Sequence, residues 1–171
     1  MRSLLTFIGL MFFLNLAFSE EFSIEEKNLI ALPKPVVMAI RAPKNFEFPE
    51  CNLVGKVVNI TDTAKASEYI ATTSQACGWG AAAGPIWVVA KVNGGYTVVL
   101  QTTAYATEIL KHKAHGLHQL VTTSGTAGHA SYTRWEFTGK TYRQLENYVF
   151  LPDDEKLCKA HKEICPFESN N

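Results

Sequence analysis

Three histidines recur at every third position of one segment, at His112, His115 and His118. On a helix this spacing would bring the first two close together as ligands for zinc or copper. Gly116 favours another interpretation, in which a helix ends just before this glycine and the cationic side chains of its last turn suit the negative end of the helix dipole. His129 is a further candidate for a metal-binding or pH-sensing site. The pattern leaves both interpretations open.

Hydroxyl and imidazole groups also lie close together further along the chain, where Ser124 and Ser131 flank His129. A serine hydrolase would use such groups, but neither serine lies in the strand-nucleophile-helix turn that exposes a catalytic hydroxyl. The glycine pairs lack the strand-to-helix context of a phosphate-binding loop, and no dinucleotide fingerprint is present. We therefore expect no enzyme activity, no catalytic residue, no cofactor and no metal ligand. The alternatives are a small-ligand or metal-binding module around the three histidines and an uncharacterised hydrolase.

The four cysteines are Cys51, Cys77, Cys158 and Cys165. In an exported protein an even count is most simply explained by two disulfides, and four cysteines allow three pairings. We favour Cys51 with Cys77 and Cys158 with Cys165, because the second pair would close a short terminal loop. Each bridge would stabilise the fold by about 2–4 kcal/mol. The alternative, a structural zinc site, lacks the paired short spacings of its ligands.

The segment between the last two cysteines carries three cationic groups, Lys159, His161 and Lys162. On a disulfide-closed loop these groups would form a stiff tip, which loses little conformational entropy when it binds. A histidine flanked by lysines can hydrogen-bond to acidic groups in the cleft of a partner. We predict that Lys159, His161 and Lys162 contact a protein partner. The alternative is a disulfide that only ties down the terminus.

Residues 1–19 have the layout of a secretory signal peptide, with Arg2 before an apolar run and small residues before the exit at Ser19. The run is interrupted by Asn15 and is short for a membrane span, which favours cleavage over a retained membrane helix. The mature chain, residues 20–171, has the size of one domain. The formal net charge is zero for the full chain, so no global field attracts it to nucleic acid or anionic lipid. We expect a periplasmic or secreted protein with no stable membrane anchor.

The clearest structural signal is two β-branched runs around Asn93-Gly94-Gly95, which predict a hairpin over 86–100. A second hairpin is predicted over 133–146, where aromatic and polar residues alternate before a turn at Gly139. The other expected elements are helices over 23–32, 62–74 and 103–113, strands over 36–40, 56–60 and 117–123, and a helix after Pro152. Together they predict an α+β fold, with an antiparallel sheet of about five strands built from hairpins and a few short helices on one face.

The run Gly116-Leu117-His118-Gln119-Leu120, followed by an aromatic hairpin that ends in Gly139-Lys140-Thr141-Tyr142, resembles a pattern of small exported bacterial envelope proteins. In that pattern a Gly-apolar-x-x-Leu turn and strand precedes an aromatic hairpin that ends in Gly-x-x-Tyr. The strand Ala83-Gly84-Pro85-Ile86-Trp87 is similar as well. The resemblance covers residues 77–142 and implies a hairpin fold and an envelope setting, but no catalytic residue. Gln119 stands where an acidic residue is frequent.

The run Cys158-Lys159-Ala160-His161 resembles the Cys-Lys-x-His loop with which some periplasmic lysozyme inhibitors plug the carboxylate-lined cleft of their target. In this chain the loop is longer and lies at the C-terminus. The resemblance implies an inhibitor. The sequence as a whole therefore favours an exported binding protein that inhibits or neutralises a macromolecular partner, either a cell-wall hydrolase or an antibacterial toxin.

The export signal and the even cysteine count together predict that the mature chain starts at Glu20 and contains no free thiol. The intact mass of the secreted protein, measured before and after alkylation without reduction, checks both points. Alkylation of two or more cysteines would contradict the prediction and would favour a catalytic or metal-binding role for them.

Overall fold

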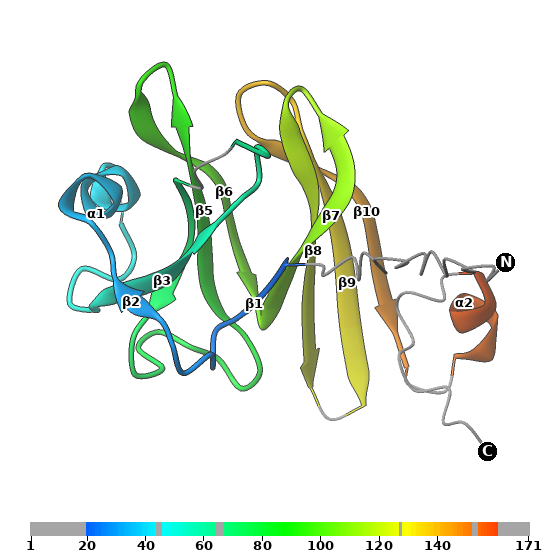
Figure 1. Cartoon of the computed structure of the whole chain (residues 1–171). Helices are drawn as coiled ribbons and strands as arrows, with labels where there is room; N and C mark the ends of the chain where they lie inside the picture. The colour runs from blue at the N-terminus through cyan, green and yellow to red at the C-terminus, as the bar shows by residue number, and fades with distance from the viewer. Residues whose placement is uncertain (1–19, 44–45, 64–66, 127, 152–153, 161–171) are drawn as a thin grey trace, which may run out of the picture.

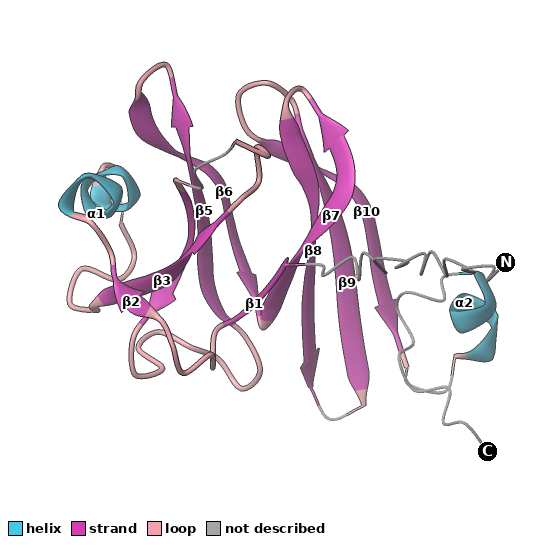
Figure 2. Ribbon diagram, in the orientation of Figure 1, coloured by secondary structure: helices cyan, strands magenta, loops and turns pink. Residues whose placement is uncertain are grey.

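The computed structural model describes residues 20–43, 46–63, 67–126, 128–151 and 154–160, which contain ten strands and two helices (Figures 1 and 2). The strands are β1 (Glu20–Ser23), β2 (Ile30–Ala31), β3 (Leu53–Val58), β4 (Glu68–Thr73), β5 (Gly84–Val92), β6 (Gly95–Ala104), β7 (Ala106–Ala114), β8 (Leu117–Thr126), β9 (His129–Phe137) and β10 (Tyr142–Phe150). The helices are α1 (Lys34–Arg41) and α2 (Glu155–Ala160). None of the described helices is long and apolar enough to cross a membrane.

The strands form two antiparallel sheets of five strands each. One sheet has the order β2-β3-β4-β5-β6, and the other has the order β1-β7-β8-β9-β10. The chain passes from the first sheet to the second at Tyr105, the single residue between β6 of the first sheet and β7 of the second. The sheets lie against one another as a sandwich (Figure 1).

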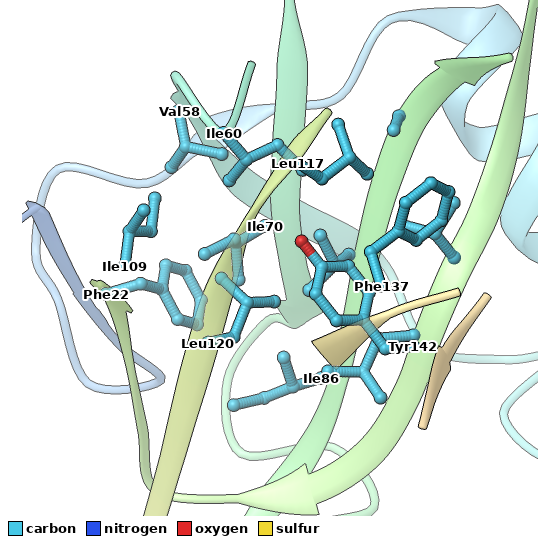
Figure 3. Packing of buried hydrophobic residues seen from close by; sticks show 14 of the residues in the cluster. Phe22, Val58, Ile60, Ile70, Ile86, Ile109, Leu117, Leu120, Phe137 and Tyr142 are labelled. Atoms are coloured by element: carbon cyan, nitrogen blue, oxygen red, sulfur yellow. The ribbon is translucent and has the colours of Figure 1, made fainter. Parts of the chain in front are cut away.

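The main core fills the space between the sheets. The first sheet contributes Ile70 and Ile86, and the second contributes Phe22, Leu120 and Phe137, all at most 5% exposed. Figure 3 shows how these side chains from both sheets pack together. Apolar residues on alternate positions of each strand supply this face, as the period of a strand requires.

Each sheet is also partly covered on its outer face. Val36 and Ile40 of α1 pack against Trp87 on the outer face of the first sheet. Leu157 of α2 packs beside Tyr132 on the outer face of the second. The two helices therefore lie at opposite ends of the layered structure (Figure 2).

These layers confirm an antiparallel, sheet-rich fold and correct the predicted α+β arrangement. A second sheet of equal size takes the place of the helices that were expected on one face. The predicted helix over 103–113 is wrong, because Thr107 and Ile109 follow the two-residue period of β7 and face the core. The predicted helices over 23–32 and 62–74 are wrong as well, since the described residues of the first segment form turns between the ends of β1 and β2, and β4 occupies residues 68–73 of the second.

The segment predicted as a strand over 36–40 is instead the helix α1. Its prolines, Pro33 and Pro35, lie at the N-cap and in the first turn, where the missing N–H groups would have no partner inside the helix. Prolines at this position are therefore compatible with a helix.

Both predicted hairpins and the strands near 56–60 and 117–123 are confirmed, as is a helix after Pro152. Asn93 and Gly94 have φ angles of 52° and 84°, as a two-residue type I′ turn requires. A disulfide joins Cys51 to Cys77, with 5.8 Å between the Cα atoms. The side chain of Cys158 and all of Cys165 lie outside the described residues, so their pairing stays a prediction.

Trp87 and Trp135, the tryptophans of the two predicted hairpins, lie in or beside a core, and Trp87 is the more deeply buried. It is 1% exposed, and its ring centroid lies 5.9 Å from that of Phe46 and 6.0 Å from that of Phe48. We expect Trp87→Ala to lower the free energy of unfolding by about 3–5 kcal/mol, because a large cavity would remain. Met38→Ala, at a position that is 63% exposed on α1, is the matched control. Urea unfolding measures both, and equal midpoints for Trp87→Ala and the wild type would contradict this core assignment.

Candidate functional site

Three hairpin turns lie at one end of the sandwich, which we call the hairpin end. They are Asn93-Gly94 between β5 and β6, His115-Gly116 between β7 and β8, and residues 138–141 between β9 and β10 (Figure 1). His115 and Gly116 have φ angles of 49° and 89°, so this turn also has positive φ at both central residues. Short turns of this kind fix the positions of the side chains beside them.

A cleft of about 270 Å³ opens between these turns. Its floor includes Leu117 and Phe137, which belong to the core between the sheets and are 7% and 5% exposed. Its rim includes Lys91, Asn93 and His115, all exposed. The cleft therefore combines an apolar floor with a polar and cationic rim.

Unpaired positive charge gathers around this cleft. Lys91, and Lys140 beside the cleft residue Gly139, are exposed and form no ion pair within the part of the chain that the structure describes. The Nζ atom of Lys91 lies 5.4 Å from the ring centroid of Tyr96, a cation-π contact that leaves its charge available. Arg143 lies 2.9 Å from the carboxylate of Glu136 and holds the pKa of that carboxyl below its usual range. The Glu136 carboxylate near the cleft is thus already paired with Arg143.

Behind the rim lies a network of charged groups that we call the Asp62 clasp, formed by Asp62, Lys113 and His118. The buried ring of His118 contacts the carbonyl oxygen of Leu110 through Nδ1 and Oδ1 of Asp62 through Nε2, the latter at 2.9 Å. The contact to Leu110 follows from a bulge in β7, where three residues lie opposite the single residue Gln119 of β8.

The Asp62 carboxylate also accepts a hydrogen bond from Lys113. The hydrogen bonds from Lys113 and then from His118 hold the pKa of Asp62 below its ordinary value. Asp62 has a φ of 59°, a conformation that aspartate tolerates better than most residues. Asp62 lies in the loop after β3 of the first sheet, and its carboxylate contacts Lys113 on β7 and His118 on β8 of the second sheet.

The clasp corrects the interpretation of the histidines as a helix end. His112 lies in the bulge of β7, His115 lies in a turn and His118 lies on β8. Nδ1 and Nε2 of His118 contact the Leu110 carbonyl and the Asp62 carboxylate, so neither ring nitrogen faces an open position where a metal could bind. In the sequence, the pair His115-Gly116 is a turn signal, and recognising it would have placed His118 on a strand.

Among the described residues, one group places three potential ligand atoms within 4.8 Å of one another. It consists of Glu50, Cys51 and Cys77, and the two cysteines form a disulfide. The three histidines, as far as the structure describes them, form no such group. The metal-binding alternative therefore has no assembled ligand set in the described segments.

A second cleft, of about 330 Å³, lies at the opposite end of the sandwich and gathers Ser124, Ser131 and His129. The two serine hydroxyls are hydrogen-bonded to each other at 2.6 Å across β8 and β9. No hydrogen bond joins His129 to either serine within the described residues, and no carboxylate is among the lining residues. The sequence candidates for a hydrolase thus meet in space, but as a cross-strand hydroxyl pair without an oriented base.

The predicted partner-binding tail is described only at its start. Lys159 lies in the last turn of α2, where its exposed Nζ atom is 3.9 Å from the Glu155 carboxylate. His161 and Lys162 lie outside the described residues. A role for this segment in binding stays a prediction.

No protein-family model matches this chain, and no curated protein or solved structure is significantly similar to it.

The lowered pKa of Asp62 makes a prediction about acid stability. A carboxyl whose pKa is lower in the folded chain than its ordinary value of 3.8 stabilises the fold above that value, and this contribution is lost as the pH falls below it. We expect Asp62→Asn to be less stable than the wild type at pH 6 and the two to converge toward pH 2. Glu47→Gln, at an exposed carboxylate, is the control. Thermal melts from pH 6 to pH 2 measure the difference, and a constant gap over this range would contradict the assignment.

Proposed function

We propose that this protein is an exported binding protein that neutralises an acidic macromolecular partner, such as a cell-wall hydrolase or an antibacterial toxin, and that the hairpin end is its contact surface. The observation that carries the proposal is the cleft with a floor of Leu117 and Phe137 and a rim that includes Lys91 and His115. A cationic rim around an apolar floor suits an acidic loop that also carries an apolar side chain.

The distribution of charge supports an acidic partner. The formal net charge of the chain is zero, so a partner is attracted by a local surplus and not by the protein as a whole. Lys91 and Lys140 supply such a surplus at the hairpin end, while the nearby Glu136 and Asp62 are already in ion pairs. A carboxylate-lined cleft in a partner would have the complementary charge.

The construction of the site also favours binding. The turns at Asn93-Gly94 and His115-Gly116 are as short as hairpin turns commonly are, and both are anchored in five-stranded sheets. A surface that is already ordered loses less conformational entropy when a partner binds. The Cys51–Cys77 disulfide favours an oxidising compartment and supports export.

Paired charge reversals test the proposal. We expect Lys91→Glu combined with Lys140→Glu to weaken binding at least about tenfold, because two attractive contacts become repulsive. The control is Lys27→Glu combined with Lys34→Glu, which makes the same change in net charge at two exposed lysines that do not line the cleft. Inhibition of purified muramidases and amidases and binding to purified toxin domains provide the measurements.

His161→Ala in the same assays separates the two candidate surfaces. If the tail loop inserts into the partner, this variant should weaken inhibition by about 1–3 kcal/mol with little change in folding stability, as expected for a lost hydrogen bond to a buried charge. A loss in His161→Ala without a loss in the lysine reversals would move the contact surface to the tail. Absence of binding to every enzyme and toxin tested would contradict the proposed function.

A further inference from the structure

The Asp62 clasp joins the two sheets directly beside the cleft. The loop after β3 belongs to the first sheet, and its carbonyl oxygens accept hydrogen bonds from the second: the backbone N–H of His118 donates to Ile60 at 2.9 Å, and Nζ of Lys113 donates to Thr61 at 3.0 Å. The Asp62 carboxylate accepts hydrogen bonds from both side chains. These contacts hold the start of β8, whose first residue Leu117 lines the cleft floor.

The two ring contacts of His118 require the charged form of the imidazole. A carbonyl oxygen can only accept a hydrogen bond, so Nδ1 must carry a proton to bind Leu110. An ionised carboxylate also only accepts, so Nε2 must carry a proton to bind Asp62. The lowered pKa of Asp62 supports its ionised form near neutral pH. A neutral imidazole has one N–H and would lose one of the two contacts.

The other charged groups near the ring do not supply a substitute for this proton. Lys113 of β7 donates to Asp62 and cannot accept. From β10, the Tyr142 hydroxyl donates to the backbone carbonyl of His118 at 2.6 Å, and burial raises the pKa of this tyrosine. On β9, Glu136 is paired with Arg143 and reached by the side chain of Gln119, the neighbour of His118.

Two further groups complete these surroundings. On β4, Glu68 accepts a hydrogen bond from the Thr61 hydroxyl at 3.5 Å. In the turn, His115 is exposed at the rim of the cleft. Neither is hydrogen-bonded to the ring of His118, whose own protonation therefore decides whether both of its contacts persist.

We propose that the Asp62 clasp is a proton-dependent lock on the hairpin end. With His118 charged and Asp62 ionised, the lock is closed and the cleft keeps its shape. When His118 loses a proton to solvent, one ring contact breaks, and the link between the sheets loosens at the floor of the cleft. Binding of the acidic partner then weakens as the pH rises. The effect on the partner rests on the proposed function, whereas the lock itself does not.

The free, mature protein tests the lock without any partner. In ¹⁵N NMR spectra recorded at pH 5.5 and pH 8.5, the lock predicts two protonated ring nitrogens on His118 at the lower pH and one at the higher. The backbone amide of His118 reports the contact to Ile60. After correction for the intrinsic pH dependence of exchange, its protection factor should fall at least about tenfold across this range, the size expected for a lost charged hydrogen bond.

Two variants and a matched control give the test its specificity. Asp62→Gly removes the carboxylate acceptor and suits the positive φ of this position, and His118→Phe removes the ring nitrogens, so neither should show the pH step. His115→Gln changes an exposed histidine three residues away and should keep it. Because Asp62 is 62% exposed, its variant is suited to the test even if His118→Phe fails to fold. A singly protonated ring at pH 5.5, or a step that persists in Asp62→Gly, would overturn the lock.

Partner binding at the two pH values completes the experiment, with the ionic strength held constant. We expect the wild type and His115→Gln to bind less tightly at pH 8.5 and Asp62→Gly to show no such step. Equal binding at both pH values despite the loss of amide protection would overturn the link between lock and cleft. A pH step in the free protein with no binding to any tested hydrolase or toxin would leave the lock standing and contradict the proposed function.

Discussion

The structure depends on the burial of two apolar sheet faces against each other. Phe22, Ile86 and Leu120 are among the residues that meet in this layer, and a fully buried side chain of this kind contributes about 1.5–3 kcal/mol relative to an exposed one. The layer fixes which face of every strand points inward. It therefore also fixes where the hairpins end, because the turns must lie beyond the edges of the packed layer. The gathering of three turns around one cleft is a consequence of this packing.

The parts of the fold that were predictable from sequence are those with local signals. The Asn93-Gly94 turn and the flanking β-branched runs predicted β5 and β6, since positive φ and a two-residue period are both written in neighbouring residues. The strand β7 was predicted as a helix because its bulge at residues 110–112 interrupts the two-residue period. The second sheet was missed as well, since β7 is the strand that joins β1 to β8 in it.

The candidate site was less predictable, because its contacts join distant parts of the chain. Asp62 and His118 are 56 positions apart, and neither residue type indicates the other. The histidine spacing drew attention to the right segment but suggested a helix, whereas a hairpin exposes His115 and buries His118. The cationic surface predicted from sequence consists of Lys159, His161 and Lys162, near the C-terminal end of the sequence. The cleft at the hairpin end is a second basic surface, which became visible only when the turns were brought together.

These features give one physical account of the site: a rigid core positions short turns, the turns position unpaired lysines around an apolar floor, and a charged network behind the rim joins the two sheets. A direct test is an NMR titration of the ¹⁵N-labelled mature protein with a short glutamate-rich peptide that carries one aromatic residue. The account predicts that the amide signals of Gly94, Gly116 and Gly139, the turn glycines around the cleft, shift together and saturate. Shifts confined to α1 or α2, or no saturable shift at the three glycines, would contradict the claim that the hairpin end is an acidic-partner surface.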